Sequence, residues 1–81
     1  MGSKKNNNFA PRLTELRERN GWTKVQLAKH LGCSKSMITE YEQGKKLPGY
    51  NMLAKMRDLF EETADYIMGE SDIRSLKKIA Q

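Results

Sequence analysis

The feature that most constrains the fold of this 81-residue chain lies between Thr23 and Glu42, where two short amphipathic segments flank a single glycine. In the first segment, Leu27, Ala28 and Leu31 form one narrow apolar stripe at helical spacing. The small side chain of Ala28 lets a second helix approach where a larger residue would hold it away. The stretch therefore predicts two short helices that cross at close range.

The ends of these two helices are also marked in the sequence. Thr23 can cap the first helix, and Gln26, three residues later, can complete a capping box. Gly32 can end that helix in the left-handed conformation, which costs glycine almost nothing. Ser34 is a good N-cap for the helix that follows. These signals predict helices over residues 23–31 and 34–43, joined by a tight turn.

The second helix carries one entirely polar face. At about 100° per residue, the side chains that share this face are those of Lys35, Ser36, Thr39, Glu40 and Gln43. An ordinary surface helix also has a polar face, so the face alone decides little. Its short hydrogen-bonding side chains, together with the tight turn before it, favour a helix-turn-helix that enters the major groove of DNA.

Three further helices are expected around this pair, over residues 10–20, 49–60 and 63–68. The inward face of the helix over 49–60 is expected to carry Leu53, Met56, Leu59 and Phe60. Ser71 can cap one more short helix near the end of the chain. The expected fold is all-α, a compact bundle of about five helices with a short C-terminal helix or tail.

The chain resembles the Cro/repressor-type helix-turn-helix family, the Xre-like group of bacterial and phage regulators. The residues that carry the resemblance are Leu27-Ala28, Gly32, Cys33-Ser34, Glu42-Gln43-Gly44-Lys45 and Pro48, with Leu13-x-x-Leu16-Arg17 upstream and Asp65-Tyr66-Ile67-Met68-Gly69 downstream. Cys33 replaces the usual valine, and Tyr50 and Arg57 occupy positions that are more often aliphatic or small. The resemblance implies a lambda-repressor-like fold, with a DNA-binding domain over 9–69 and a C-terminal helix or tail over 70–81. The run Asn6-Asn7-Asn8 predicts a disordered arm over 1–8.

Charge and composition are consistent with a polyanionic partner. The net charge is +5 and the isoelectric point is about 9.5. The lysines in or beside the helix-turn-helix are Lys24, Lys35, Lys45 and Lys46, whereas Glu61, Glu62, Asp65, Glu70 and Asp72 gather towards the other end. The alternative interpretation of such a charge run is an ordinary solvated face, but its coincidence with the motif favours DNA.

Other chemistry is nearly absent from the sequence. His30 and Cys33 make at most two metal ligands, fewer than zinc requires, and no nucleophile has a credible base, so we expect neither an enzyme nor a metal or cofactor. Cys33 is expected to act as a small core hydrophobe. The chain has no apolar run of membrane-spanning length and a polar N-terminus, which predicts a soluble cytoplasmic protein.

The expected DNA contacts fall into two groups. The residues expected near base edges are Lys35, Ser36, Thr39 and Glu40, since lysine can donate to guanine, glutamate can accept from cytosine and the threonine methyl can touch thymine. The residues expected to contact phosphates are Lys24, Gln43, Lys45, Lys46 and Tyr50, contacts that add affinity without direct sequence information. Two assignments have alternatives: Glu40 as a surface residue that repels wrong backbones, and Tyr50 as a core aromatic.

The resemblance also implies an architectural role for two charged residues. In the family, the residues matching Arg17 and Glu42 form a partly buried ion pair that joins the first helix to the end of the recognition helix. The alternative for Arg17 is a contact with phosphate. Trp22, Tyr41 and Tyr66 are most simply core aromatics.

The leading hypothesis is a sequence-specific regulator of transcription that binds double-stranded DNA, expected to be a repressor acting on an inverted-repeat operator. A homodimer is expected, because one such domain covers about half of a bacterial operator. The residues expected at its interface are Ile67, Met68, Ile73, Leu76 and Ile79, although Ile73 and Leu76 could instead fold back on their own domain. Alternatives are a restriction-modification controller protein and an antitoxin-type interaction module, and a protein regulator or antirepressor is a further conceivable partner.

Overall fold

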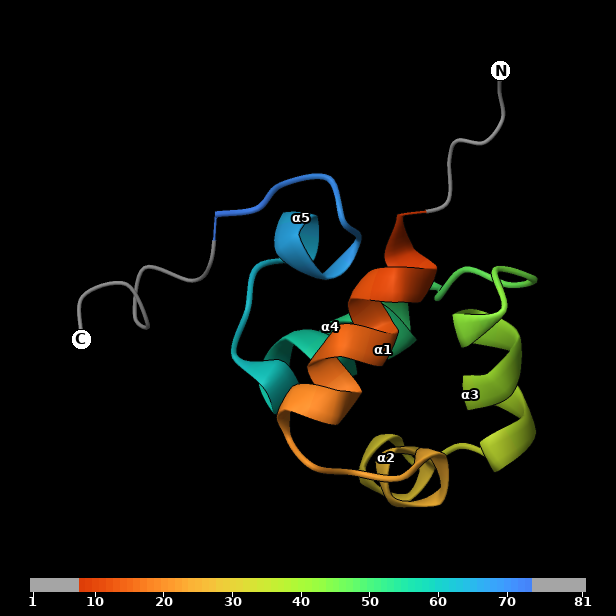
Figure 1. Cartoon of the computed structure of the whole chain (residues 1–81). Coiled ribbons are helices and arrows are strands. Elements are labelled where there is room, and N and C mark those ends of the chain that lie inside the picture. The colour runs from red at the N-terminus through yellow and green to blue at the C-terminus, as the bar shows by residue number, and fades with distance from the viewer. Residues whose placement is uncertain (1–7, 74–81) are drawn as a thin grey trace.

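Five α-helices make up the computed structural model of the chain, which describes residues 8–73 (Figure 1). They are α1 (Phe9–Arg19), α2 (Lys24–Leu31), α3 (Lys35–Glu42), α4 (Tyr50–Phe60) and α5 (Ala64–Ile67). No strand occurs in residues 8–73, so the predicted all-α bundle is confirmed. Residues 71–73 are not helical. The rest of the helix expected from Ser71, and nearly all of the expected N-terminal arm, lie outside the described residues.

Side-chain caps fix where the short helices begin. Thr23 Oγ1 accepts from the Gln26 amide at 3.1 Å while Gln26 Oε1 accepts from the Thr23 amide at 2.8 Å, which completes the predicted capping box. Gly32 ends α2 with φ +72°, and Ser34 Oγ accepts from the Met37 amide at 3.1 Å. These caps satisfy backbone groups that would otherwise lack partners at the helix ends.

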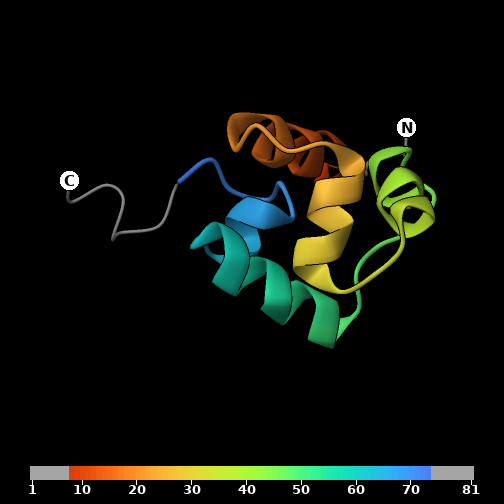
Figure 2. The ribbon, with the colours of Figure 1, turned by 90° about the horizontal axis from the view of Figure 1, so that it is seen from below.

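All five helices contribute buried side chains to the core, and α3 packs on α1 and α2 (Figure 2). The ring of Phe9 meets that of Tyr41 edge to face, with centroids 5.7 Å apart. This contact, together with the buried Ile38, fastens the inner side of α3 to the bundle. Because one side of α3 is held in this way, its opposite polar side faces away from the core.

The residues expected in the core differ in how deeply they are buried. Tyr41, Tyr66, Met56 and Phe60 are buried, whereas the side chains that lie only half-buried at the edge of the core are those of Trp22, Cys33, Leu53 and Leu59. Burial raises the pKa of the Cys33 thiol, consistent with its expected role as a small hydrophobe. The two departures from the family pattern on α4, Tyr50 and Arg57, are exposed and do not disturb the packing.

The structure does not support Ile67 as a residue of the expected dimer interface. Ile67 was expected at a dimer interface, but its side chain is 0% exposed within the single chain. The reason is that α5 contacts both α1 and α4, so its apolar side is already covered. Met68 also packs partly against the core, whereas Ile73 is 68% exposed. Leu76 and Ile79 lie outside the described residues.

Candidate nucleic-acid interface

The outward face of α3 forms a shallow hollow with a volume of about 290 Å³. The residues that line it are Lys35, Ser36, Thr39, Glu40, Gln43 and Lys45. All four residues expected near base edges are therefore together, along with two of those expected to contact phosphates. A concave, hydrogen-bonding surface with lysines beside it has the chemistry needed to meet the edges of base pairs and the flanking phosphates.

The other three residues expected at phosphates do not line this hollow. Lys24 is half-buried in the first turn of α2, and Tyr50 is strongly exposed at the start of α4. Lys46 lies in the loop after α3, with its Nζ atom 3.7 Å from Glu40 Oε1. One predicted phosphate contact is thus paired with one predicted base contact.

An ion pair holds the end of α3 against α1. Arg17 Nε donates to Glu42 Oε2 at 2.7 Å, and Arg17 Nη2 donates to Glu42 Oε1 at 3.2 Å. A third bond runs from Arg17 Nη1 to the Trp22 carbonyl at 3.0 Å, in the turn before α2. The hydrogen bond to Glu42 raises the pKa of Arg17 and keeps the guanidinium charged. The pair holds the end of α3 against α1, and it therefore helps to set the orientation of the polar face of α3.

Comparison with known proteins agrees with this architecture. Residues 8–65 match the model of a family described as "Helix-turn-helix domain". The chain belongs to this helix-turn-helix family. It is 41% identical over 58 residues to the HTH-type transcriptional regulator AnsR of Bacillus subtilis, a match that covers 72% of this chain and 50% of AnsR. The chain spans about half the length of AnsR and of two other curated relatives that it matches.

Solved structures of the same fold include proteins of similar size. The P22 c2 repressor, solved in complex with a synthetic operator, superposes with a TM-score of 0.72 at 19% identity, covering 78% of this chain and 96% of that one. The restriction-modification controller protein C.AhdI of Aeromonas hydrophila gives a TM-score of 0.67 at 23% identity, covering 75% and 92%. These likenesses confirm the lambda-repressor-like fold. The family match also agrees with the prediction that the helix-turn-helix domain is not an enzyme.

A second arginine, Arg12, has a structural role that the sequence did not reveal. Its Nη1 atom donates to the carbonyls of Tyr66 at 2.6 Å and Ser71 at 3.2 Å, and its Nη2 atom donates to Asp72 Oδ1 at 2.7 Å. The guanidinium also lies over the Tyr66 ring, 4.0 Å from its centroid. Arg12 therefore ties α1 to the chain after α5. No local pattern signals this, because the partners lie more than one helix away in sequence.

The two ends of the described chain meet near this arginine. Gly69 has a φ of +77°, and a Cβ atom there would lie 2.5 Å from the carbonyl oxygen of Asn8. Only glycine fits such a close approach of two backbones. Arg19 adds a bond from Nη2 to the Tyr66 hydroxyl at 2.9 Å, which raises the pKa of Arg19.

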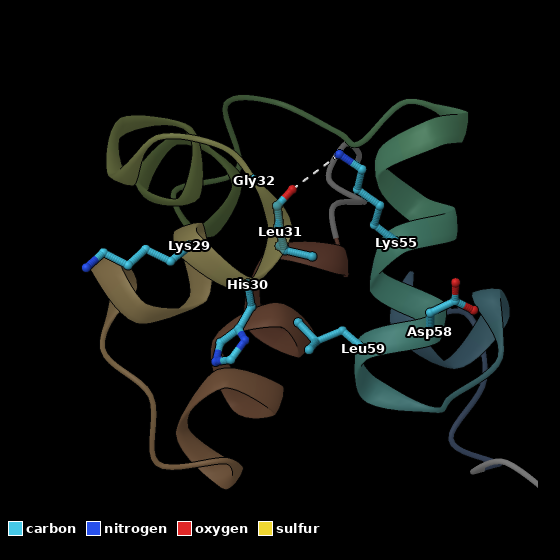
Figure 3. Close-up of a pocket in the computed structure, with 7 residues that line it drawn as sticks. All are labelled: Lys29, His30, Leu31, Gly32, Lys55, Asp58 and Leu59. Atoms are coloured by element: carbon cyan, nitrogen blue, oxygen red, sulfur yellow. Dashed lines mark hydrogen bonds between the residues drawn. The ribbon is translucent and has the colours of Figure 1, made fainter.

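A larger groove of about 490 Å³ lies between the end of α2 and α4 (Figure 3). Its polar groups do not converge on one point. Lys55 Nζ donates to the Leu31 carbonyl at 3.4 Å, which satisfies an acceptor at the end of α2, and the Lys29 amine points away from Lys55. His30 lies against the ring of Trp22, with centroids 4.3 Å apart. Two of its polar side chains, Lys55 and His30, are thus engaged in structural contacts, and the hollow on α3 is the stronger candidate site.

The described residues provide neither a metal cluster nor a membrane-spanning helix. Within residues 8–73, no three His, Cys, Asp or Glu residues are placed to hold a metal ion. In the same range, no helix has the length and apolar character needed to span a membrane.

Proposed function

We propose that this protein is a sequence-specific regulator of transcription that binds double-stranded DNA, and that it acts as a repressor at an inverted-repeat operator. The observation that carries the proposal is the hollow on α3, where four side chains able to discriminate bases lie together on one exposed face. Membership of the helix-turn-helix family supports the same conclusion.

In this mechanism α3 lies in the major groove and α2 crosses the sugar-phosphate backbone. Lys35 can donate to guanine O6 or N7, and Glu40 can accept from cytosine N4. The Thr39 methyl can contact the methyl group of thymine, while the Ser36 hydroxyl can donate or accept. These four groups would supply direct readout of the sequence.

Phosphate contacts would set the position of α3 in the groove. Lys45 and Gln43 lie at the edge of the hollow, and Lys24 lies in the first turn of α2, whose backbone amides also attract anions. Tyr50 offers an exposed hydroxyl from the start of α4. Such contacts contribute affinity and make binding dependent on salt.

A homodimer remains part of the proposal, because two half-sites give the affinity that a repressor needs at physiological salt. Ile73 is the described residue that best fits an interface, since it is a large apolar side chain that is mostly exposed. Ile67 is not part of the proposed dimer interface, because its side chain is fully buried within the single chain.

A restriction-modification controller is the second candidate function. It is favoured by the likeness to C.AhdI, whose chain is covered over 92% of its length. Such a protein can activate as well as repress. A reporter gene placed behind the selected operator separates the two, since a pure repressor only lowers expression.

The proposal is tested by selecting bound sequences from a pool of random double-stranded DNA. The expected result is enrichment of one sequence arranged as an inverted repeat. Asp58→Asn, a change on α4 outside the α3 hollow, serves as a control that should select the same sequence. Recovery of unrelated sequences by the wild-type protein in repeated selections would contradict sequence-specific binding.

A further inference from the structure

The hollow on α3 contains a carboxylate on a surface proposed to face a polyanion. Glu40 lines that hollow beside Thr39 and Gln43. An unpaired carboxylate there would repel nearby phosphates and favour any position that keeps it away from DNA. The pairing of Glu40 with Lys46, at 3.7 Å, offsets this repulsion.

The backbone after α3 places Lys46 next to Glu40. The Gly44 amide donates to the Tyr41 carbonyl at 3.2 Å, and the Lys45 amide donates to the Glu40 carbonyl at 2.9 Å. With Gly44 at a φ of +79°, these two bonds form a Schellman motif. The motif folds the loop back over the last turn of α3, and Lys46 therefore lies beside Glu40.

Lys45 provides an internal comparison. It is the neighbour of Lys46, lines the same hollow and is exposed. In the part of the chain that the structure describes, no ion pair includes Lys45, whereas Lys46 is paired with Glu40. The two adjacent lysines therefore have different roles available: Lys45, outside the ion pairs of residues 8–73, can contact phosphates, and Lys46 is the partner of a base-facing carboxylate.

We propose that Lys46 is a positioning residue for Glu40 and thereby helps to set the DNA sequence that the protein prefers. The ammonium group holds the carboxylate in place and neutralises part of its charge, so that Glu40 can accept a hydrogen bond from a base. This inference rests on the proposed function, and it replaces the expectation that Lys46 contacts phosphate without affecting specificity.

The pairing of Lys46 with Glu40 predicts a particular pattern of effects when the two residues are changed. If Lys46 acts through Glu40, the effects of changing the two residues are not additive, as is usual for residues in direct contact. Both side chains are close to half exposed, at 45% for Lys46 and 47% for Glu40, so neither change should disturb folding. A readout of base preference then separates positioning from a simple loss of positive charge.

The experiment measures binding of six proteins to the selected operator and to a set of its single base-pair variants. The proteins are the wild type, Lys46→Ala, Lys46→Arg, Glu40→Gln, the double variant Lys46→Ala with Glu40→Gln, and the control Lys45→Ala. Thermal melts verify that all six are folded.

We expect Lys46→Ala and Glu40→Gln to change the preference at the same base pair, and Lys46→Arg to retain it. Lys46→Ala should reduce the affinity for the operator in the wild-type protein and also in the Glu40→Gln protein. The fold-reduction should be at least about threefold smaller in the Glu40→Gln protein. Lys45→Ala should weaken binding to every variant by one common factor.

Two other results carry different meanings. If Lys46→Ala weakens all sequences by one factor, whatever stands at residue 40, Lys46 contacts phosphate alone and the inference is overturned while the proposed function stands. If the wild-type protein shows no preferred sequence, the proposed function fails and the inference fails with it.

Discussion

Arg17 on α1 and Glu42 at the end of α3 form a bidentate ion pair, with N to O distances of 2.7 and 3.2 Å. The Arg17 side chain is 13% exposed and that of Glu42 is 6% exposed. Because the same guanidinium also holds the Trp22 carbonyl, one side chain links α1, the turn before α2, and the recognition helix. The orientation of the proposed DNA-binding face thus depends on a pair that does not belong to that face.

Glu42→Ala should lower the free energy of unfolding by about 3 kcal/mol, because it leaves the Arg17 charge largely buried without its partner. The measurement is chemical denaturation monitored by circular dichroism. Glu18→Ala is the matched control, since Glu18 lies 4.0 Å from the same arginine but is 68% exposed. It should cost less than about 1 kcal/mol. Absence of coupling between Arg17 and Glu42 in a double-mutant cycle would show that the pair does not form.

Arg12→Lys should loosen the chain that follows α5. Lysine keeps the positive charge but cannot reproduce the fork of bonds to two carbonyls and a carboxylate. We expect a loss of stability of about 1 to 2 kcal/mol. The Glu70 amide, bonded to the Asp65 carbonyl at 2.9 Å, should also exchange its hydrogen faster. Arg57→Lys on the exposed side of α4 is the control, and an equal effect of both changes would argue against the role of Arg12.

DNA binding should be strongly dependent on salt. If a dimer neutralises roughly 6 to 10 phosphates, its affinity for the operator falls by about 10³ to 10⁵ between roughly 50 and 200 mM salt. Fluorescence anisotropy of labelled operator DNA gives this slope directly. Lys45→Ala should make the slope shallower by about one phosphate per subunit. A response that stays flat over this range is incompatible with the proposed phosphate contacts.

Ser36→Ala and Thr39→Ala should alter which base is preferred at particular positions of the site. Where either side chain reads a base, the change in discrimination should be roughly 1 to 3 kcal/mol. Competition binding with single base-pair variants of the operator measures it. Equal losses on operator and random DNA for both variants would mean that this face of α3 does not lie against the bases.

Ile73→Glu should weaken dimer formation and operator binding together, without lowering the melting temperature, since Ile73 is exposed within one chain. The two recognition helices of the dimer should lie about 34 Å apart, matching one turn of DNA. Sedimentation at micromolar concentration, with and without operator, tests the association. Ile67→Glu is the contrasting variant and should unfold the domain, because its side chain is 0% exposed. Unchanged sedimentation and affinity for Ile73→Glu would remove Ile73 from the interface.

The helices and the polar face of α3 could be predicted from the amino-acid sequence alone. Thr23, Gln26 and Ser34 make their capping bonds to groups three residues away, so the short segment around them contains all the information needed. The polar face of α3 likewise follows from helical periodicity, and the structure brings its residues together in one hollow.

The burial of individual side chains and the contacts between distant groups follow from the packing of the helices and could not be predicted from the sequence. Ile67 appears in the sequence as one more apolar residue, and it is buried because α5 contacts both α1 and α4. Arg12 meets Tyr66 and Asp72 across more than 50 positions of sequence. Periodicity and capping act within a turn or two of helix, whereas burial and long-range pairing depend on how whole helices pack together.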